Sequence, residues 1–116
     1  MGKTFTIATK PKVWWPVEVI RAADGGKTET FRFRAFIEKL SAADLEQIKD
    51  SSDDDIAIIR NRIHDWDEVF DDQGEKVAFD EDALDAAMDD LDVRDGLRSA
   101  VMEVSYGRGA RKNSRK

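Results

Sequence analysis

Residues 13–36 read VWWPVEVIRAADGGKTETFRFRAF, and this stretch decides the fold. Two segments rich in branched and aromatic residues, 13–21 and 30–36, flank the turn sequence Ala-Asp-Gly-Gly at 23–26. Because glycine tolerates positive φ, a glycine turn between two strand-like segments predicts a β-hairpin over residues 13–36. Pro16 has no N–H to donate to a ladder, which places the first strand at a sheet edge or at a bulge.

The hairpin needs a covering layer, since an isolated hairpin is marginally stable in water. Phe31 and Phe33 alternate with Arg32 and Arg34, so the two phenylalanines share one face. We therefore expect a helix to cover this face.

Helical signals follow the hairpin. Ser41 and Asp44 form a short capping box for a first helix that ends by Asp50. The acids of residues 53–55 suit the N-terminus of a second helix because they complement its dipole. Residues at helical spacing predict one buried stripe in that second helix: Ile56, Ile59, Ile63 and Trp66.

Two more helices are expected in the second half of the chain. Asp80 caps the first, whose apolar positions run from Ala83 to Leu91. Asp92 caps the second, and Gly107 ends it as a C-cap. The apolar stripe predicted for this last helix is Val93, Leu97, Val101 and Val104.

The order of these elements predicts the fold class and the domain organisation. The chain is expected to be an α+β protein, mostly helical, with an N-terminal β-hairpin packed on a bundle of about four short helices. An N-terminal arm spans residues 1–12, a single domain spans 13–106, and a flexible basic tail spans 107–116.

The charge is unevenly distributed along the 116 residues, whose formal net charge is −6. Residues 41–95 hold 20 acids against five basic residues, whereas 107–116 hold five basic residues and no acid. Such an acidic body repels nucleic acid and membrane phosphates. No apolar run is long enough for a membrane span, and the first residues lack the apolar region of a signal peptide. These features predict a cytoplasmic protein without a membrane or nucleic-acid partner.

Patterns that carry catalysis or bind metals are scarce. The chain has no cysteine and a single histidine, His64, which excludes thiolate zinc sites and catalytic triads. The acids after His64 lack the alternating ligand spacing of a calcium loop. We therefore interpret Asp71, Asp72 and Glu75 as a solvated turn around Gly74 and assign no catalytic residue, cofactor or metal ligand.

Apolar anchors lie on both sides of this turn. Trp66 and Val69 precede it, and Val77 and Phe79 follow it. We expect residues 76–79 to be extended, to pair back on 66–70, and so to clamp the turn onto the core.

An acidic, cysteine-free domain with charged ends is typical of a binding module. Trp14 and Trp15 point to opposite sides of a strand, so either one indole is an exposed interface anchor or both are covered. Phe5 and Ile7 alternate in the arm and could pair with a partner strand, which leaves self-association open. The basic tail offers further candidate contacts: Arg108, Arg111 and Lys112.

Short motifs follow one another in a fixed order over about 100 residues. They are Trp15-Pro16-Val17, Asp24-Gly25, Phe31-Arg32-Phe33, Trp66-Asp67-x-Val69, Asp72-x-Gly74, Val77-x-Phe79, Tyr106-Gly107-x-Gly109 and Lys112-Asn113. This ordered set resembles one known family, the tail assembly chaperones of long-tailed, lambda-like bacteriophages (siphoviruses). The chain departs from that pattern where Asp-Glu, in place of Asp-Gly, follows Trp66.

The resemblance implies a non-enzymatic role in virion morphogenesis. Such chaperones bind and solubilise the tape measure protein, help recruit tail tube protein subunits, and leave before the tail is complete. In many of these phages a frameshift produces a longer second form, and the basic tail lies where such an extension would attach.

Three other functions compete with this hypothesis. A structural tail or head–tail connector protein would stay in the virion. An acidic DNA mimic or inhibitor is suggested by the acids of residues 41–95, although the basic tail disfavours it. A small metal-dependent enzyme would have to use the acids around Gly74.

Overall fold

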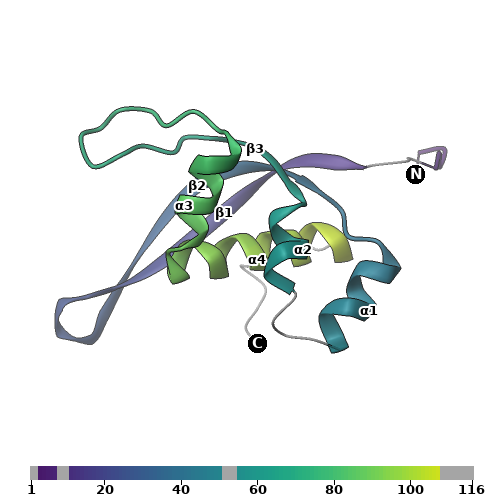
Figure 1. Ribbon diagram of the computed structural model, residues 1–116, viewed down its shortest axis with the longest axis horizontal. Coiled ribbons are helices and arrows are strands. Elements are labelled where there is room, and N and C mark those ends of the chain that lie inside the picture. Colours follow the sequence, from purple (N-terminus) through teal and green to yellow (C-terminus); the bar gives the residue numbers. More distant parts are fainter. Residues whose placement is uncertain (1–2, 8–10, 51–54, 108–116) are drawn as a thin grey trace.

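The computed structural model describes residues 3–7, 11–50 and 55–107, which form an α+β fold with one antiparallel sheet (Figure 1). The sheet has the order β1-β2-β3, so β2 is central. Four helices pack against the sheet, and the predicted α+β class is confirmed. The strands are β1 (Lys12–Ala23), β2 (Lys27–Glu38) and β3 (Ile63–Asp67), and the helices are α1 (Ala42–Asp50), α2 (Asp55–Arg60), α3 (Glu81–Met88) and α4 (Leu91–Tyr106).

The predicted hairpin is confirmed, with β1 and β2 joined by a short helical turn at Asp24–Gly26. Gly25 and Gly26 have φ of 76° and 79°, which explains why the turn requires glycine. Val17 pairs with Phe33 in the register of the two strands, and Val19 pairs with Phe31. These residues lie on the face of the sheet toward the helices, where Val17 and Val19 are buried and Phe31 is 50% exposed.

β1 is an edge strand, as Pro16 indicated. The Lys39 N–H donates to the Pro11 carbonyl (3.0 Å), so Pro11 and Lys39 are a hydrogen-bonded pair of the antiparallel ladder. Odd-numbered residues of β1 therefore bond to β2, and even-numbered residues direct their backbone groups to the free edge. Pro16 removes an N–H only from that edge.

Helix α4 closes much of this edge. It packs mainly against β1, with Leu97, Ala100 and Val101 in the core. Gly96 lies so close to β1 that a Cβ at this position would be 2.4 Å from the Glu18 carbonyl oxygen. The missing side chain of Gly96 thus sets the distance between helix and strand.

The predicted helical stripe through Ile63 and Trp66 is wrong. Helix α2 ends at Arg60, and Ile63 and Trp66 lie in strand β3. Ile37 pairs with Ile63, whereas its neighbour Phe36 pairs with Asp65, so β3 carries one extra residue. This bulge turns Ile63 and Trp66, three residues apart, toward the same core.

The predicted helix starts are partly confirmed. Ser41 and Asp44 cap α1 reciprocally: the Asp44 N–H donates to Ser41 Oγ (3.1 Å) and the Ser41 N–H to the Asp44 carboxylate (3.0 Å). The Asp80 carboxylate accepts from the Ala83 N–H (2.7 Å), as expected. Residues 51–54 lie outside the described residues, so the acids predicted to begin α2 are represented only by Asp55.

The predicted boundary before the last helix is wrong. Asp90 caps α4 by accepting from the N–H of Asp92 (3.0 Å), because Asp90 has extended backbone angles whereas Asp92 is already helical. Leu91 therefore belongs to α4 and is exposed. Gly107, with φ of 67°, ends α4 as predicted.

Candidate interaction surface

A groove of about 400 Å³ lies between the hairpin, the segment after β3 and the helices. Most of its lining side chains are apolar. They come from the hairpin (Val19, Arg21, Phe31, Arg32, Phe33), from residues 66–70 (Trp66, Glu68, Val69, Phe70) and from α3 and α4 (Ala87, Val93). We call this surface the groove.

Trp66 forms the floor of the groove. Its ring makes edge contacts with Phe33 (6.3 Å between centroids) and Phe79 (5.2 Å), and its Nε1–H donates to the Val77 carbonyl (2.8 Å). The Val77 N–H in turn donates to the Val69 carbonyl (2.8 Å). The turn around Gly74 therefore packs as the sequence predicted: Val69 before it is hydrogen-bonded to Val77 after it, and Trp66 contacts both Val77 and Phe79.

Two phenylalanines of the groove are exposed to solvent. Phe31 is 50% exposed and Phe70 is 57% exposed. Sequence reasoning predicted that a helix would cover Phe31 and Phe33, but only Phe33 is half-buried. The hairpin tip extends beyond the helices (Figure 1), which leaves Phe31 without cover.

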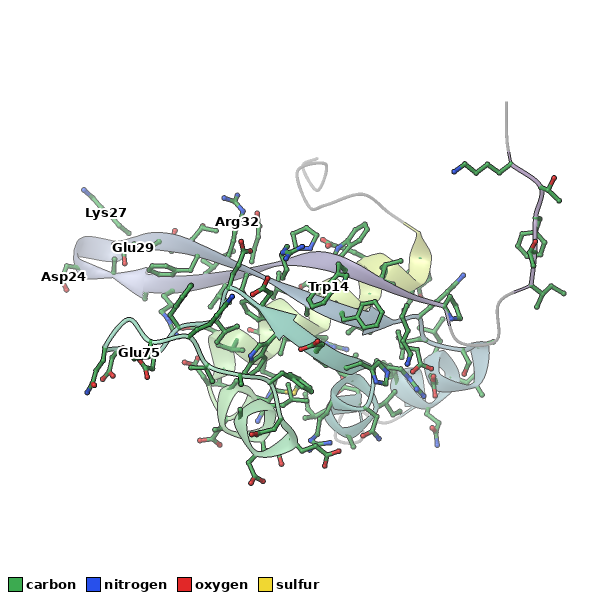
Figure 2. All side chains as sticks on the ribbon, turned by 90° about the horizontal axis from the view of Figure 1, so that it is seen from above. Trp14, Asp24, Lys27, Glu29, Arg32 and Glu75 are labelled. Atoms are coloured by element: carbon green, nitrogen blue, oxygen red, sulfur yellow. The ribbon has the colours of Figure 1, made fainter. Side chains whose placement is uncertain are left out.

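The loop of residues 68–76 forms an acidic wall beside the groove. Residues 68–75 contain four acids and no basic residue. Asp71 folds the loop by accepting from the N–H groups of Gln73 and Glu75 (2.9 Å each). Figure 2 shows Glu75 on this loop at the same end of the molecule as Asp24 and Lys27 of the hairpin tip.

Asp67 fixes the base of this loop. Its carboxylate contacts Lys76 Nζ (2.9 Å) and Arg34 (2.9 Å), and it accepts from the Glu68 N–H (2.8 Å). Lys76, the Glu68 N–H and Arg34 together lower the Asp67 pKa to about 2. Glu68 has a positive φ of 68°, so the chain turns sharply where it leaves β3.

The opposite wall carries the basic side chain of Arg21. Arg21 contacts Asp90 (2.9 Å) and Asp92 (3.1 Å) at the start of α4. The bond to Asp90 raises the pKa of Arg21, and the same bond lowers the pKa of Asp90. This charge is thus neutralised within the chain, whereas the acids of the loop tip are exposed.

The face of the sheet away from the helices has a different character. On this outer face Trp14 stacks at a tilt against Phe36 (5.3 Å between centroids), and the Arg34 guanidinium lies 5.2 Å from the Trp14 ring centre. Arg32 pairs with Glu18 (2.9 Å). Figure 2 shows Trp14 and Arg32 along the strands. Each has a partner on this face: Trp14 packs on the ring of Phe36, and Arg32 donates a hydrogen bond to Glu18.

The structure separates the predicted partner-binding residues. Trp14 is exposed on the outer face, whereas Trp15 points inward and donates from Nε1 to Glu103 of α4 (2.8 Å). Phe5 and Ile7 are each 84% exposed, and the N-terminal segment that holds them lies apart from Trp14 (Figure 2). Three predicted residues of the basic tail lie outside the described residues: Arg108, Arg111 and Lys112.

Sequence reasoning missed the groove as a surface. Its exposed anchors Phe31 and Phe70 come from segments 39 residues apart, by their numbers. The signal that could have indicated it was the pair of apolar residues, Val69 and Phe70, directly before three polar residues and a glycine. Val69 packs against the core, whereas its neighbour Phe70 bridges to Lys76 through the backbone and leaves its side chain 57% exposed.

The described residues were also compared with the geometry that a metal ion requires. No group of three or more potential ligands that could hold a metal ion occurs within residues 3–7, 11–50 and 55–107. His64 contacts Glu38 (2.7 Å), and Glu38 also contacts Arg62 (3.2 Å). Arg62 in turn contacts Asp44 (3.0 Å), so this network joins β2, β3 and α1. None of the described helices has the length and apolar character that crossing a membrane requires.

Comparisons with protein-family models, with curated proteins and with solved structures found no match to this chain. The function of the chain is therefore inferred from the groove, from the charges around it and from the motif resemblance.

Proposed function

We propose that the protein is a tail assembly chaperone of a long-tailed bacteriophage. It acts in the host cell cytoplasm, without catalysis, by binding the tape measure protein and holding it soluble while tail tube protein subunits assemble. The single observation that carries this proposal is the apolar groove with exposed Phe31 and Phe70 on a strongly acidic body.

The physical requirements of such a chaperone support the proposal. A long helical client exposes apolar stripes, and a groove lined by aromatic and aliphatic side chains offers them a complementary surface. The acidic surface of the complex then prevents aggregation, because like-charged particles repel one another. The ordered motifs between Trp15 and Lys112 favour this client over other helical proteins.

Co-expression with the tape measure protein of the same phage tests the proposal. The wild-type chain is expected to raise the soluble yield of that protein and to co-elute with it on a sizing column. Phe70→Ser removes a side chain whose burial contributes about 1.5–3 kcal/mol, so affinity falls about 10- to 100-fold. Leu91→Ser is the matched control, because Leu91 is 66% exposed but does not line the groove.

Three outcomes contradict the proposal. Equal loss of binding in Phe70→Ser and Leu91→Ser excludes the groove as the client site. An insoluble tape measure protein and no complex with the wild-type chain exclude the chaperone function itself. Detection of the chain in purified virions by mass spectrometry supports a structural tail or connector protein instead.

A further inference from the structure

The described start of the N-terminal arm, residues 3–7, exposes two apolar side chains that do not contact the core. Phe5 and Ile7 are both 84% exposed, and neither belongs to the core or to the hydrophobic residues packed against it. The surrounding sequence is basic: residues 1–12 contain three lysines and no acid. The arm is thus an apolar segment within a positively charged sequence.

The groove has the opposite charge. Its mouth exposes Phe31 and Phe70, and the 68–75 loop beside it holds four acids and no basic residue. Two apolar surfaces with complementary charges attract each other, and association covers both. The arm and the groove therefore have the properties of two halves of one interface.

A chain cannot bring Ile7 of its arm to its own groove. The Pro11 carbonyl accepts a hydrogen bond from the Lys39 N–H (3.0 Å), which fixes Pro11 at the start of the hairpin. Phe31 pairs with Val19, which lies eight residues after Pro11. Eight residues of β-strand span about 26 Å. Four residues, the separation of Ile7 from Pro11, span at most about 14 Å. Ile7 therefore cannot reach the mouth of its own groove.

The arm and the groove also lie at opposite ends of the molecule. Figure 1 shows the first described residues at one end of the long axis, and the hairpin tip and the 68–76 loop at the other end. In Figure 2, turned by 90°, the same ends remain apart. This arrangement suits a head-to-tail contact, in which each copy offers its arm to one neighbour and its groove to another.

We propose that the arm of one copy docks in the groove of a second copy, with Phe5 and Ile7 against Phe31 and Phe70. Because the contact is heterologous, it builds chains or rings larger than a dimer. The inference shares the groove with the proposed function, and it implies that a client of the groove competes with self-association. It does not require that the client be a tape measure protein.

Sedimentation velocity of the full chain over a wide concentration range tests the inference. The wild-type chain is expected to rise from the mass of a monomer to masses above that of a dimer. The double substitution Phe5→Ser with Ile7→Ser is expected to stay monomeric, and so is Phe31→Ser with Phe70→Ser. Far-UV circular dichroism checks that each variant is folded, and Leu91→Ser serves as a control that associates like the wild type.

Mixing the two double variants gives the sharpest result. The arm variant keeps an intact groove and the groove variant keeps an intact arm, so only one arm–groove contact per pair is available. The mixture is expected to form a dimer and nothing larger. A wild-type chain that is monomeric throughout, an arm variant that associates like the wild type, or a mixture that grows beyond a dimer overturns the inference.

A disulfide trap gives an independent measurement, since the chain has no cysteine. Ile7→Cys and Phe70→Cys copies, mixed under mild oxidation, are expected to form the heterodimer in several-fold excess over either homodimer. A statistical distribution of dimers contradicts the docked geometry. If self-association holds while the tape measure protein stays insoluble on co-expression, only the proposed function fails; the reverse result rejects this inference alone.

Discussion

The outer face of the sheet and the groove both expose aromatic side chains, but their surroundings differ. Trp14 is 42% exposed, yet Phe36 stacks on it and Arg34 covers its ring. Phe31 and Phe70 are 50% and 57% exposed and have no aromatic or cationic partner among the described residues. The exposed fraction alone does not distinguish these aromatic residues. What separates Phe31 and Phe70 from Trp14 is that they line a groove without an aromatic or cationic partner.

The charges of the two regions differ in the same way. Arg32 and Arg34 on the outer face are each paired with an acid, so that face has little uncompensated charge to offer a partner. The acids at the tip of the 68–76 loop are exposed and lie beside an apolar groove. We infer that the outer face contributes to stability and that the groove is available for binding.

The largest expected effect is a difference in the free energy of unfolding between substitutions of the buried Trp66 and of the exposed Trp14. Trp66→Ala removes the floor of the groove and is expected to lower the free energy of unfolding by about 3–5 kcal/mol. Trp14→Ala removes one stacking and one cation–π contact and is expected to cost about 1 kcal/mol. Urea denaturation followed by circular dichroism measures both. Equal losses would falsify the division between supporting core and outer face.

A smaller effect is expected at the close contact between α4 and β1. Gly96→Ala raises helix propensity by about 1 kcal/mol, but its Cβ would be 2.4 Å from the Glu18 carbonyl oxygen. We expect a net loss of about 2 kcal/mol, because α4 must move away from β1.

Asp95→Ala is the control for this contact, since Asp95 is the exposed neighbour of Gly96 on the same helix. It is expected to change stability by less than about 0.5 kcal/mol. If Gly96→Ala stabilises the protein, α4 does not depend on close approach to hold the edge of β1.

The hairpin was predictable because its signals are local. Its turn depends on the glycines at 25 and 26, and its second strand on the alternation before Phe36. The start of α1 was predictable for the same reason, because the cap at Ser41 acts within three residues. Ile63 and Trp66 were assigned to a helix because a spacing of three residues fits a helical stripe and also fits a bulged strand. Only the partner strand β2 decides between them.

The groove could not be derived in the same way. Phe31 shares a face with Phe33, as predicted, but its exposure depends on how far the hairpin extends beyond helices that follow much later in the chain. The arm shows the converse. Phe5 and Ile7 were predicted as partner-binding residues from alternation alone, and their high exposure agrees with that role without testing it.

The smallest expected effect concerns Asp67, which connects the two regions. On one side it pairs with Arg34 of the outer face, and on the other it holds Lys76 of the groove loop. Its pKa is lowered from 3.8 to about 2 in the folded protein. A depressed pKa means that the stabilisation is present above pH 3.8 and is lost as the pH falls toward 2.

We therefore expect Asp67→Asn to be less stable than the wild type at neutral pH, and this difference to disappear as the pH falls through about 2, the pKa of Asp67 in the folded protein. Asp44, Asp85 and Asp90 also have lowered pKa values, so the wild type loses further stability in acid, and only the difference between the two proteins reports on Asp67. Denaturation with urea at several pH values measures that difference. Amide exchange at Glu68 and Val77 adds a local measurement, because faster exchange in Asp67→Asn locates the loss in the groove wall. A stability difference that does not vary with pH shows that the Asp67 carboxylate is not what holds the loop.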